Sequence, residues 1–390
     1  MTVRTTASRA PGAWSPGQEA ALADVSRWMR GGSSTSQVYC LFGAAGTGKS
    51  TLVRELVAES ARPWLFAAFT GKAALVMRQK GCVGATTIHS LIYRPSGETR
   101  TKDGRPQPTF RLHEESPLLW APGVVIDECS MVDEQMGRDL LSFGKKVLVC
   151  GDPWQLPPIG GGGFFTGRTP DCLLTEIHRQ ARESSILDLA TFLREGGDPW
   201  KRLDWSTEDC AVVHRGGNQR ELWGRMTVAD QVIVGLNRTR HKFNVQHRRL
   251  LGARSHWPAP GDKLVCLRND RELGLFNGSM WCVQAAELAG DERTIGLELS
   301  SVEHDSQTLA VRSWAHHFDG REHVLDDMAG ARMEHGEFGY GYNITCHKAQ
   351  GSQYGDVVLY DESRSFDGET ARRWLYTGVT RAADRLLLVV

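Results

Sequence analysis

The feature that most constrains this chain is a short apolar strand that runs into a glycine-rich loop and then a helix. It lies in the segment YCLFGAAGTGKSTL, Tyr39–Leu52. Val38–Phe42 is short, apolar and rich in β-branched and aromatic residues, which is typical of a buried strand. Leu52, Val53 and Leu56 then recur at helical spacing. The loop between them fits the pattern G-x-x-x-x-G-K-[ST], and strand, loop and helix together are the context that this pattern requires.

This loop predicts phosphate binding. Its glycines let backbone N–H groups turn inward around a phosphate chain, and the helix N-terminus adds its positive dipole end. We expect Lys49 to reach the β- and γ-phosphates and Ser50 to bind Mg²⁺. A glycine-rich turn that precedes a helix by chance explains the pattern less well, because every motif position and both flanks agree. On this interpretation the chain binds a nucleoside triphosphate, which many proteins of unrelated function also do.

Composition sets the other limits. The 390 residues suggest two or three domains at ~150 residues each. Lys and Arg number 46, as do Asp and Glu, which weakly opposes a nucleic-acid binder, although a neutral chain can carry a basic groove. The nine cysteines form no C-x-x-C, which favours reduced thiols over disulfides or zinc. No apolar run approaches the ~20 residues that span a bilayer, and the N-terminus resembles a frayed tail more than a secretory signal, so we expect a cytoplasmic protein.

Strands that alternate with helices predict a parallel sheet with helices on both faces. The predicted helix is Gln18–Arg30, and the further predicted strands are Trp64–Phe69, Gly123–Asp127, Lys146–Asp152, Asp356–Tyr360 and Arg385–Val390. Ligands of such sheets bind at the carboxyl ends of the strands.

Two segments break this alternation. Tyr93–Glu115 is polar and rich in Gly, Pro and Arg, so it is either a disordered loop or an extruded β-hairpin with KDG at its turn. Pro260–Val283 has short strands separated by RND and FNG turns, and the stretch after it shows little helical periodicity to about Glu337. We interpret that region as a small all-β insert.

Polar residues that follow the predicted strands carry the chemistry. Asp127 ends one strand and suits Mg²⁺, while the adjacent Glu128 can activate a water molecule. An acidic pair that caps the next helix is the alternative, which the upstream phosphate loop makes less attractive. Gln155, in GDPWQLPPIG, is a candidate γ-phosphate sensor, unless the segment is simply a proline-rich turn.

The second half of the chain supplies cations and hydrogen-bonding groups. Arg179 and Arg381 are candidates to stabilise transition-state charge on a γ-phosphate, although most arginines are ordinary surface residues. Thr345, His347 and Lys348 surround a turn that feeds a strand, and they are groups of the kind that hold backbone phosphates. His347 alone would more often be structural.

Taken together, these stretches resemble a superfamily-one DNA helicase of the RecD/Dda type, the subclass that moves 5′ to 3′. SPGQEAAL resembles the family's Q motif, where Gln18 would read adenine by bidentate hydrogen bonding. FTGKAA and ATTIHSLI resemble its strand-binding motifs. GAAGTGKST, IDECSM, GDPWQLPP, EIHRQ, TCHKAQGSQ and YTGVTRA resemble motifs I to VI in order. The resemblance spans Ser15–Val389, and Gln353 stands where relatives often carry Glu.

The resemblance implies an α/β fold of two RecA-like P-loop NTPase domains with a nucleotide cleft between them. The first domain would be residues 1–175, with a β-hairpin insert at 93–115. The second would be residues 176–390, with a small β-barrel insert at 256–336.

The resemblance also implies four sets of site residues. The catalytic residues would be Lys49, Glu128, Gln155, Arg179 and Arg381. The nucleotide-binding residues would be Gln18, Gly46, Thr47, Gly48, Lys49, Ser50, Thr51 and Gly351. The metal ligands would be Ser50 and Asp127. The DNA contacts would be Thr70, Lys72, Thr87, His89, Tyr93, Phe110, Thr345, His347 and Lys348.

The implied activity is that of a DNA helicase that uses ATP and Mg²⁺ to translocate 5′ to 3′ on single-stranded DNA and to unwind duplex. It would work as a monomer on single strands and single/double-strand junctions in a bacterial or phage-infected cell, with replication or repair proteins as candidate partners. A translocase or an RNA helicase on the same motor is the near alternative, because phosphate contacts do not distinguish DNA from RNA. A small-molecule kinase or a switch acting on a protein is the distant one.

Overall fold

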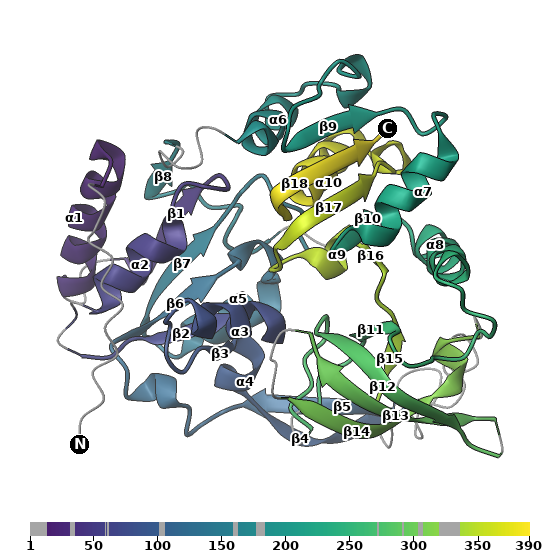
Figure 1. Ribbon diagram of the computed structural model, residues 1–390. Helices are drawn as coiled ribbons and strands as arrows, with labels where there is room; N and C mark the ends of the chain where they lie inside the picture. The colour runs from purple at the N-terminus through teal and green to yellow at the C-terminus, as the bar shows by residue number, and fades with distance from the viewer. Residues whose placement is uncertain are drawn as a thin grey trace, which may run out of the picture.

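The computed structural model describes residues 14–31, 36–58, 60, 62–100, 106–158, 163–176, 184–270, 273–290, 292–302, 307–319 and 336–390. Two parallel sheets lie beside each other, and an all-β region lies below the second of them (Figure 1). None of the helices in these ranges is both long and apolar enough to cross a bilayer.

The first sheet is parallel and covered on both faces. Its strand order is β3-β2-β6-β7-β1-β8, with bounds β1 Val38–Gly43, β2 Leu65–Ala68, β3 Thr86–Thr87, β6 Gly123–Asp127, β7 Lys146–Gly151 and β8 Cys172–Leu174. Its helices are α1 Pro16–Arg30, α2 Lys49–Ala58, α3 Gly71–Gln79, α4 Ile88–Ile92 and α5 Glu134–Ser142. Tyr39 and Leu41 pack into one core while Val38, Cys40 and Phe42 pack into the other, which explains why β1 is apolar throughout.

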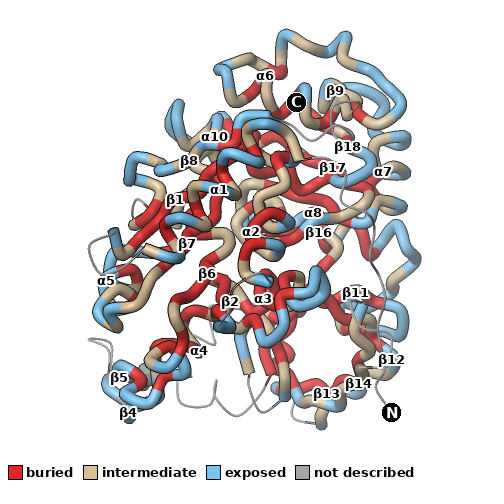
Figure 2. The backbone as a smooth tube through the Cα atoms, turned by 90° about the vertical axis from the view of Figure 1, so that its left-hand side faces the viewer, coloured by how far each residue is buried: buried red, intermediate tan, exposed pale blue. Residues whose placement is uncertain are grey.

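The second sheet repeats this plan, with strand order β16-β10-β17-β18-β9. Its strands are β9 Cys210–Val213, β10 Gln231–Val234, β16 Asn343–Thr345, β17 Tyr354–Tyr360 and β18 Ala382–Val389. Its helices are α6 Ser185–Arg194, α7 Gln219–Val228, α8 Asn237–Leu250, α9 Cys346–Ala349 and α10 Gly368–Val379. Central strands of both sheets, β6, β7 and β1 in the first and β10 and β17 in the second, are buried over most of their length (Figure 2), so the predicted α/β class is confirmed.

The polar segment after α4 forms two paired strands. β4 (Tyr93–Arg100) and β5 (Pro106–Leu112) run antiparallel, and residues 101–105 between them lie outside the described ranges. The Tyr93 hydroxyl donates to Asp139 of α5 at 2.6 Å. The His89 ring lies 4.9 Å from the Tyr93 ring and 4.4 Å from the Phe110 ring. The base of these two strands is therefore fixed to the first sheet's helices by aromatic contacts and one hydrogen bond.

The all-β region is an antiparallel sheet of order β14-β13-β12-β11-β15. Its strands are β11 Lys263–Cys266, β12 Met280–Leu288, β13 Thr294–Ser301, β14 Thr308–Trp314 and β15 Phe338–Tyr340. An isolated bridge from Ser313 to Gly336 brings the two ends of the sheet together. The sheet reaches past the expected limit at residue 336, because Phe338 and Tyr340 fill its core beside Trp281.

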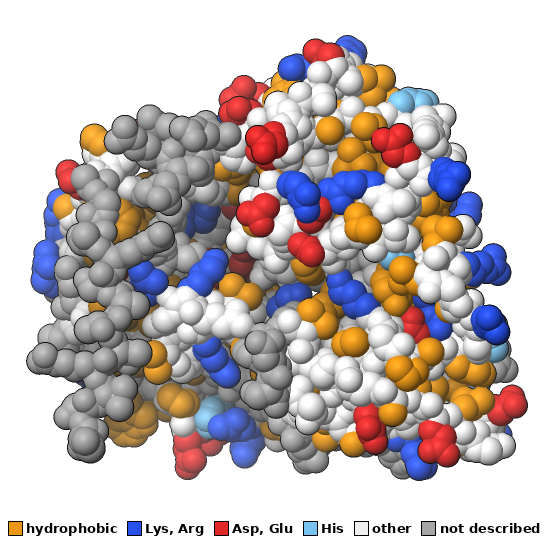
Figure 3. Space-filling model, viewed as in Figure 1, with side chains coloured by type: hydrophobic (Ala, Val, Ile, Leu, Met, Phe, Trp, Pro, Cys, Tyr) orange, Lys and Arg blue, Asp and Glu red, His pale blue; other side chains and the backbone are white. Residues whose placement is uncertain are grey.

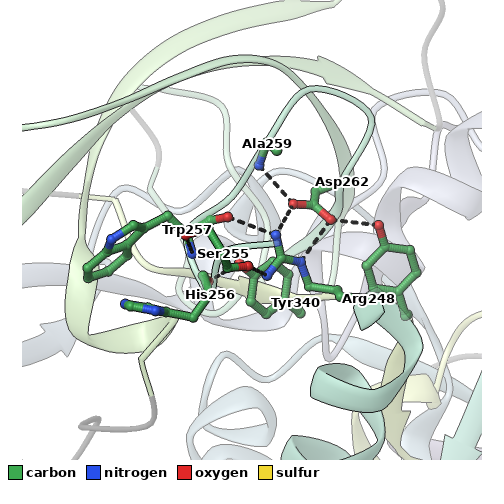
Figure 4. A network of polar contacts seen from close by, with 8 residues as sticks. Arg248, Ser255, His256, Trp257, Ala259, Asp262 and Tyr340 are labelled. Carbon is green, nitrogen blue, oxygen red and sulfur yellow. Dashed lines mark hydrogen bonds and ion pairs between the residues drawn. The ribbon is translucent and has the colours of Figure 1, made fainter. Parts of the chain in front are cut away.

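A buried ion pair fixes this region to α8 (Figure 4). Arg248 of α8 donates through Nε and Nη2 to the two carboxylate oxygens of Asp262, at 3.0 and 2.8 Å. The same guanidinium donates to the carbonyls of Ser255 and Trp257, and Tyr342 donates its hydroxyl to Asp262. Both charged side chains are less than one-tenth exposed, so each charge depends on the other for solvation.

We predict that Asp262→Ala lowers the free energy of unfolding by ~3–5 kcal/mol, because it leaves the Arg248 charge buried without its carboxylate. The exposed pair Arg138–Glu134 provides a matched control, and Glu134→Ala should cost less than ~1 kcal/mol. Urea denaturation of both variants measures the difference. Combining Asp262→Leu with Arg248→Met should recover much of the loss; equal small losses in Asp262→Ala and Glu134→Ala would contradict the role given to the pair.

Candidate nucleotide and strand-binding site

The glycine-rich loop turns sharply between β1 and α2. Gly46 and Gly48 both adopt φ of 78°, a left-handed conformation that favours glycine. The Lys49 ammonium donates to the carbonyls of Gly43 and Ala44 at 2.6 and 2.9 Å, and the buried Thr47 hydroxyl donates to Ala44. The loop is therefore held in shape by its own lysine and threonine.

The predicted acidic pair lies beside this loop. The Ser50 hydroxyl donates to a carboxylate oxygen of Asp127 at 3.0 Å, which pairs the two expected metal ligands. Glu128 adopts φ of 53°, a conformation that is costly for a residue with a Cβ. That backbone turn carries the chain from β6 into the cleft. Among the described residues, no group of three or more His, Cys, Asp or Glu side chains could hold a metal by itself.

Glu128 lies in a strongly electrostatic environment. Burial raises the pKa of its carboxyl, while the nearby charges of Arg381 and Lys49 oppose the shift. The carboxylates of Asp127 and Asp152 add to the rise. A base with a raised pKa accepts a proton more readily once it is ionised, which suits activation of a water molecule.

The cleft is a cavity of about 590 Å³ between the two sheets. The first domain contributes the loop residues Ala45–Thr51 and the acidic pair to its lining, and the second contributes Gly351, Ser352, Gln353, Thr380 and Arg381. Gln155 lines it too, and the Gln155 Oε1 atom is buried with no hydrogen-bond partner in the described part of the chain. A buried acceptor without a partner can accept a hydrogen bond from a ligand or a water molecule.

Arg381 is held rigidly at this cavity. Its guanidinium donates to the Thr377 carbonyl at 3.0 Å, to the Ser352 carbonyl at 3.1 Å and to the Thr380 hydroxyl at 3.2 Å. Gly351 approaches the first domain closely: a Cβ there would lie 3.0 Å from the Cβ of Ala73. The structure thus brings together Lys49, Glu128, Gln155 and Arg381. Arg179, the other expected arginine, lies outside the described residues.

Tyr376 is a site residue that the sequence reasoning missed. Its hydroxyl donates to Asp152 at 2.6 Å and accepts from the Ala45 N–H at 3.1 Å. It therefore reaches from α10 of the second domain to the phosphate loop of the first. Tyr376 lies in the YTGVTRA motif, but its partner Asp152 is 224 positions away. No local sequence pattern predicts such a pairing.

Gln18 has a different environment from the one expected for a residue that reads adenine. It forms a capping box with Ser15 at the start of α1, and its amide nitrogen donates to the Thr47 carbonyl at 3.1 Å. Its side chain is 3% exposed. In this arrangement the Gln18 amide supports the phosphate loop, so adenine recognition requires it to change partners.

Three of the expected strand contacts are threonines that precede helices. Thr70 and Thr87 accept the N–H groups of Ala73 and Ser90 as the caps of α3 and α4, and Thr345 precedes α9. Each lies where a strand of a parallel sheet ends, so three helix starts lie at strand ends, which is where such sheets bind their ligands.

The two expected lysine contacts lie at the all-β region. Lys72 is 7% exposed, and its ammonium lies 3.4 Å from the Gly278 carbonyl and 3.5 Å from the Tyr354 hydroxyl. Lys348 lies 3.5 Å from the Asn277 side chain. Both lysines therefore meet the β11–β12 connection, and burial of Lys72 differs from the exposed position expected of a phosphate contact. Burial also lowers the pKa of His347, which keeps that imidazole neutral.

Comparison with known families gives two matches. Residues 14–217 match the family model described as AAA domain, which is more than half of the chain. Residues 340–389 match the model described as UvrD-like helicase C-terminal domain. The first match covers the phosphate loop and acidic pair, and the second covers Thr345 and Arg381.

Two curated proteins are similar to this chain over most of its length. The ATP-dependent RecD2 DNA helicase of Deinococcus radiodurans is 29% identical over 377 residues, covering 88% of this chain and 46% of the relative. The probable conjugal transfer protein TraA of Sinorhizobium fredii is 25% identical, covering 91% of this chain and 31% of the relative. The chain thus spans less than half the length of these two curated relatives.

Solved structures show the same fold. A crystal structure of Bacteroides Pif1 bound to single-stranded DNA superposes with a TM-score of 0.60 at 18% identity, covering 97% of this chain and 93% of that chain. A structure of Pif1 helicases at forked double-stranded DNA superposes with a TM-score of 0.58 at 19% identity, covering 97% and 92%. At this identity the likeness establishes that the chain shares the α/β fold of these structures, and no more.

We predict that Tyr376→Phe destabilises the protein by ~1–3 kcal/mol, because it leaves Asp152 and the Ala45 N–H without their buried partner. Tyr93→Phe is the matched control, since Tyr93 also donates to an aspartate at 2.6 Å but is only half-buried; it should cost ~0.5–1.5 kcal/mol. Thermal denaturation compares the two.

The same variant has an expected pH dependence. Burial raises the pKa of Asp152, and the Tyr376 hydrogen bond opposes this rise. Removing the hydroxyl therefore raises that pKa further, and a raised folded-state pKa weakens stability as pH increases through it. The loss of unfolding free energy caused by Tyr376→Phe should therefore become smaller as the pH is lowered through the pKa of Asp152. A pH-independent cost would show that the Asp152 charge is not involved.

Proposed function

This chain belongs to the AAA-domain family and is a RecD- and Pif1-like member of superfamily one, and on that basis we propose that it is an ATP-dependent DNA helicase. One observation carries the proposal. Lys49 and Glu128 of the first domain line the same cavity as Arg381 of the second. A cleft completed by two domains is suited to coupling nucleotide turnover to domain movement.

The cleft residues fit ATP and Mg²⁺. We propose that the phosphate loop holds the phosphates, with Lys49 leaving the carbonyls of Gly43 and Ala44 to reach them, and that Ser50 and Asp127 hold the metal. Bound Mg²⁺ would neutralise charge on the β- and γ-phosphates. Glu128 would take the proton of the attacking water, and the orphaned Gln155 oxygen would orient that water.

Arg381 would stabilise the charge that develops on the γ-phosphate. Its backbone and hydroxyl partners already hold the guanidinium at the cavity, which favours preorganised stabilisation. Tyr376 would act as a positioning residue, because its contacts with Asp152 and Ala45 set how α10 approaches the phosphate loop. Arg179 is proposed as a second arginine on the motif alone.

We further propose that residues 1–175 and 176–390 act as two motor domains that grip single-stranded DNA alternately. Thr70, Thr87 and Thr345, at the starts of α3, α4 and α9, would contact the strand. His347 and Lys348 would add contacts from the second domain. Direction 5′ to 3′ is the expectation for RecD-like and Pif1-like motors, and RNA in place of DNA is the alternative that phosphate contacts leave open.

We propose that the β4–β5 hairpin separates duplex at the front of the first domain. Tyr93 is anchored by its bond to Asp139, whereas Phe110 is 44% exposed and so presents a ring to a base pair. The sheet β11–β15 would be the barrel-like insert of the second domain. It meets the first domain through Phe276, which packs so closely on Gly71 that a Cβ there would lie 2.2 Å from the Phe276 ring.

The test of the proposed function is ATP hydrolysis with and without single-stranded DNA. We expect strong stimulation by DNA in the unmodified chain. Lys49→Ala should abolish turnover and weaken ATP binding, because it removes the charge that faces the β- and γ-phosphates. Glu128→Gln keeps the shape and the metal site but lacks the base, so it should bind ATP and DNA without turnover.

Equal loss of ATP affinity in Lys49→Ala and Glu128→Gln would contradict the role given to Glu128. ATP hydrolysis that single strands do not stimulate would contradict the motor itself and favour a switch that acts on another partner.

Replacing Arg94–Thr109 with a short Gly-Ser turn should abolish duplex unwinding while single-strand-stimulated ATP hydrolysis survives. Stacking on a base is worth ~1–3 kcal/mol, comparable to ~1.4 kcal/mol for a DNA stacking step, so an exposed ring at the junction can separate a pair. Phe110→Ala should weaken unwinding in the same direction, and Tyr93→Phe should leave it nearly unchanged. Strand-separation assays on a forked substrate measure all three, and unwinding at the parent rate without the hairpin would make it an ordinary loop.

A further inference from the structure

A second large cavity lies on the side of α8 that faces α7 and the all-β region. Its volume is about 730 Å³, and it shares no lining residue with the nucleotide cleft or with the proposed strand contacts. Its walls come from α7, from α8, from the ends of the all-β region and from Arg215 and Tyr360 beside the second sheet. The proposed ATPase cycle therefore does not involve this cavity.

The lining of this cavity is strongly cationic. It contains four Lys or Arg side chains and one carboxylate, Asp319, among the described residues. The lining of the nucleotide cleft, by comparison, has four such cations against three carboxylates. Because the whole chain is neutral, this excess is a local accumulation of positive charge. Lys and Arg side chains line the edge of the molecule where α7 and α8 lie (Figure 3).

Aromatic rings accompany the cations. The Trp223 and Tyr360 rings each lie 5.0 Å from the Phe243 ring in edge-on contact, and the Arg215 guanidinium lies 5.0 Å from the centre of the Tyr360 ring. All four residues line the cavity. Cations with adjacent aromatic surface are the combination that holds single-stranded nucleic acid, whose phosphates and bases need both.

Lys242 and Arg249 are the exposed cations of this lining. Neither side chain has an ion-pair partner in the part of the chain that the structure describes. The backbone N–H groups of Gly235 and Leu236 and the hydroxyl of Thr239, at the start of α8, already donate to Glu362 at 2.6–2.9 Å. Any anion in the cavity would therefore be bound by side chains and not by the helix end.

The register of the second sheet connects this cavity to the proposed strand path. Val234 of β10 pairs with Thr345 of β16, and α8 begins three residues after Val234. The start of α8 thus lies at the sheet edge where Thr345 would contact DNA. From there α8 extends for about 21 Å at 1.5 Å per residue. Its basic residues Arg240, Lys242 and Arg249 line the cavity along this length.

We propose that this cavity is a second binding site for single-stranded nucleic acid, which takes the 5′ part of the strand after it leaves the motor. The proposal rests on the proposed helicase function. If the hairpin of the first domain meets the junction, the strand ahead of the motor runs over the first domain. The strand behind a 5′-to-3′ motor is then its 5′ part, and it leaves over the second domain beside α8.

The test compares two double variants that change the net charge equally. Lys242→Glu with Arg249→Glu reverses the exposed cations of the cavity. Lys201→Glu with Arg372→Glu reverses two exposed cations of the second domain that line none of the cavities described above. None of the four residues belongs to the proposed ATPase machinery.

Binding of oligothymidines of increasing length gives the first measurement. The cavity variant should bind long strands several-fold more weakly than the parent. Its slope of log affinity against log salt should shrink by about 1.4, at ~0.7 for each of two lost phosphate contacts. Short strands that fill the motor alone should bind normally, DNA-stimulated ATP hydrolysis should be retained, and the control variant should resemble the parent.

Crosslinking gives the second measurement. A photoreactive thymidine at the 5′ end of a long oligothymidine should crosslink to α8, and one at the 3′ end should not. Equal weakening in both double variants, equal weakening of short and long strands, or crosslinks to α8 from the 3′ end would each overturn the second site. If the parent binds no single strand at all, the helicase proposal fails and this inference fails with it. Parent binding with an unchanged cavity variant overturns this inference alone.

Discussion

The hydrogen bonds of Tyr376 are the interaction on which the arrangement of the nucleotide cleft depends. One hydroxyl on α10 contacts both a strand-end carboxylate and a backbone N–H of the phosphate loop. Because α10 leads directly into Arg381, fixing this tyrosine also fixes the distance from that arginine to the loop. The Leu156 N–H donates to the Thr377 hydroxyl one residue later, so two adjacent residues of α10 are tied to the first domain. Buried polar contacts therefore join the two domains across the cleft.

The all-β region depends on a different kind of contact. Its attachment to α8 is a doubly hydrogen-bonded ion pair with both charges buried. Its contact with the first domain is the close approach of Phe276 to Gly71 and of the Gly278 carbonyl to Lys72. Breaking the first attachment would leave a buried charge without its partner, whereas the second includes packing and a long polar contact. The all-β region is therefore attached to α8 by a buried ion pair and to the first domain by packing and a long polar contact.

Charge is distributed unevenly in a chain whose total is zero. The described lining of the cleft between the two sheets has four cations and three carboxylates, a balance that suits the metal and phosphate chain that we propose for it. Among the described residues, the lining of the α7–α8 cavity has four cations and one carboxylate, a balance that suits the bare phosphodiester chain that we propose for it. Net charge is therefore a poor guide to what such a chain binds, because association depends on local potential and not on the sum.

The sequence by itself determined the elements that have local causes. The phosphate loop, the strand that ends at Asp127, the turn at the FNG segment and the pairing tendency of the segment after Tyr93 follow from short-range periodicity, glycine placement and apolar runs. In the structure the phosphate loop joins β1 to α2, β6 ends at Asp127, the FNG segment lies in the β11–β12 connection, and β4 begins at Tyr93. The roles proposed for individual site residues stay predictions, and they too rest on local motifs.

Only the tertiary structure decided which distant residues meet. Tyr376 and Asp152 are 224 positions apart, and nothing in either segment encodes the other. The burial of Lys72 against Gly278, the use of the Gln18 amide by the phosphate loop and the basic cavity beside α8 are likewise products of how separate layers pack. Local sequence sets backbone conformation through sterics and hydrogen bonding within a few residues. Contacts between domains arise from the burial of whole surfaces, and that information is spread over the entire chain.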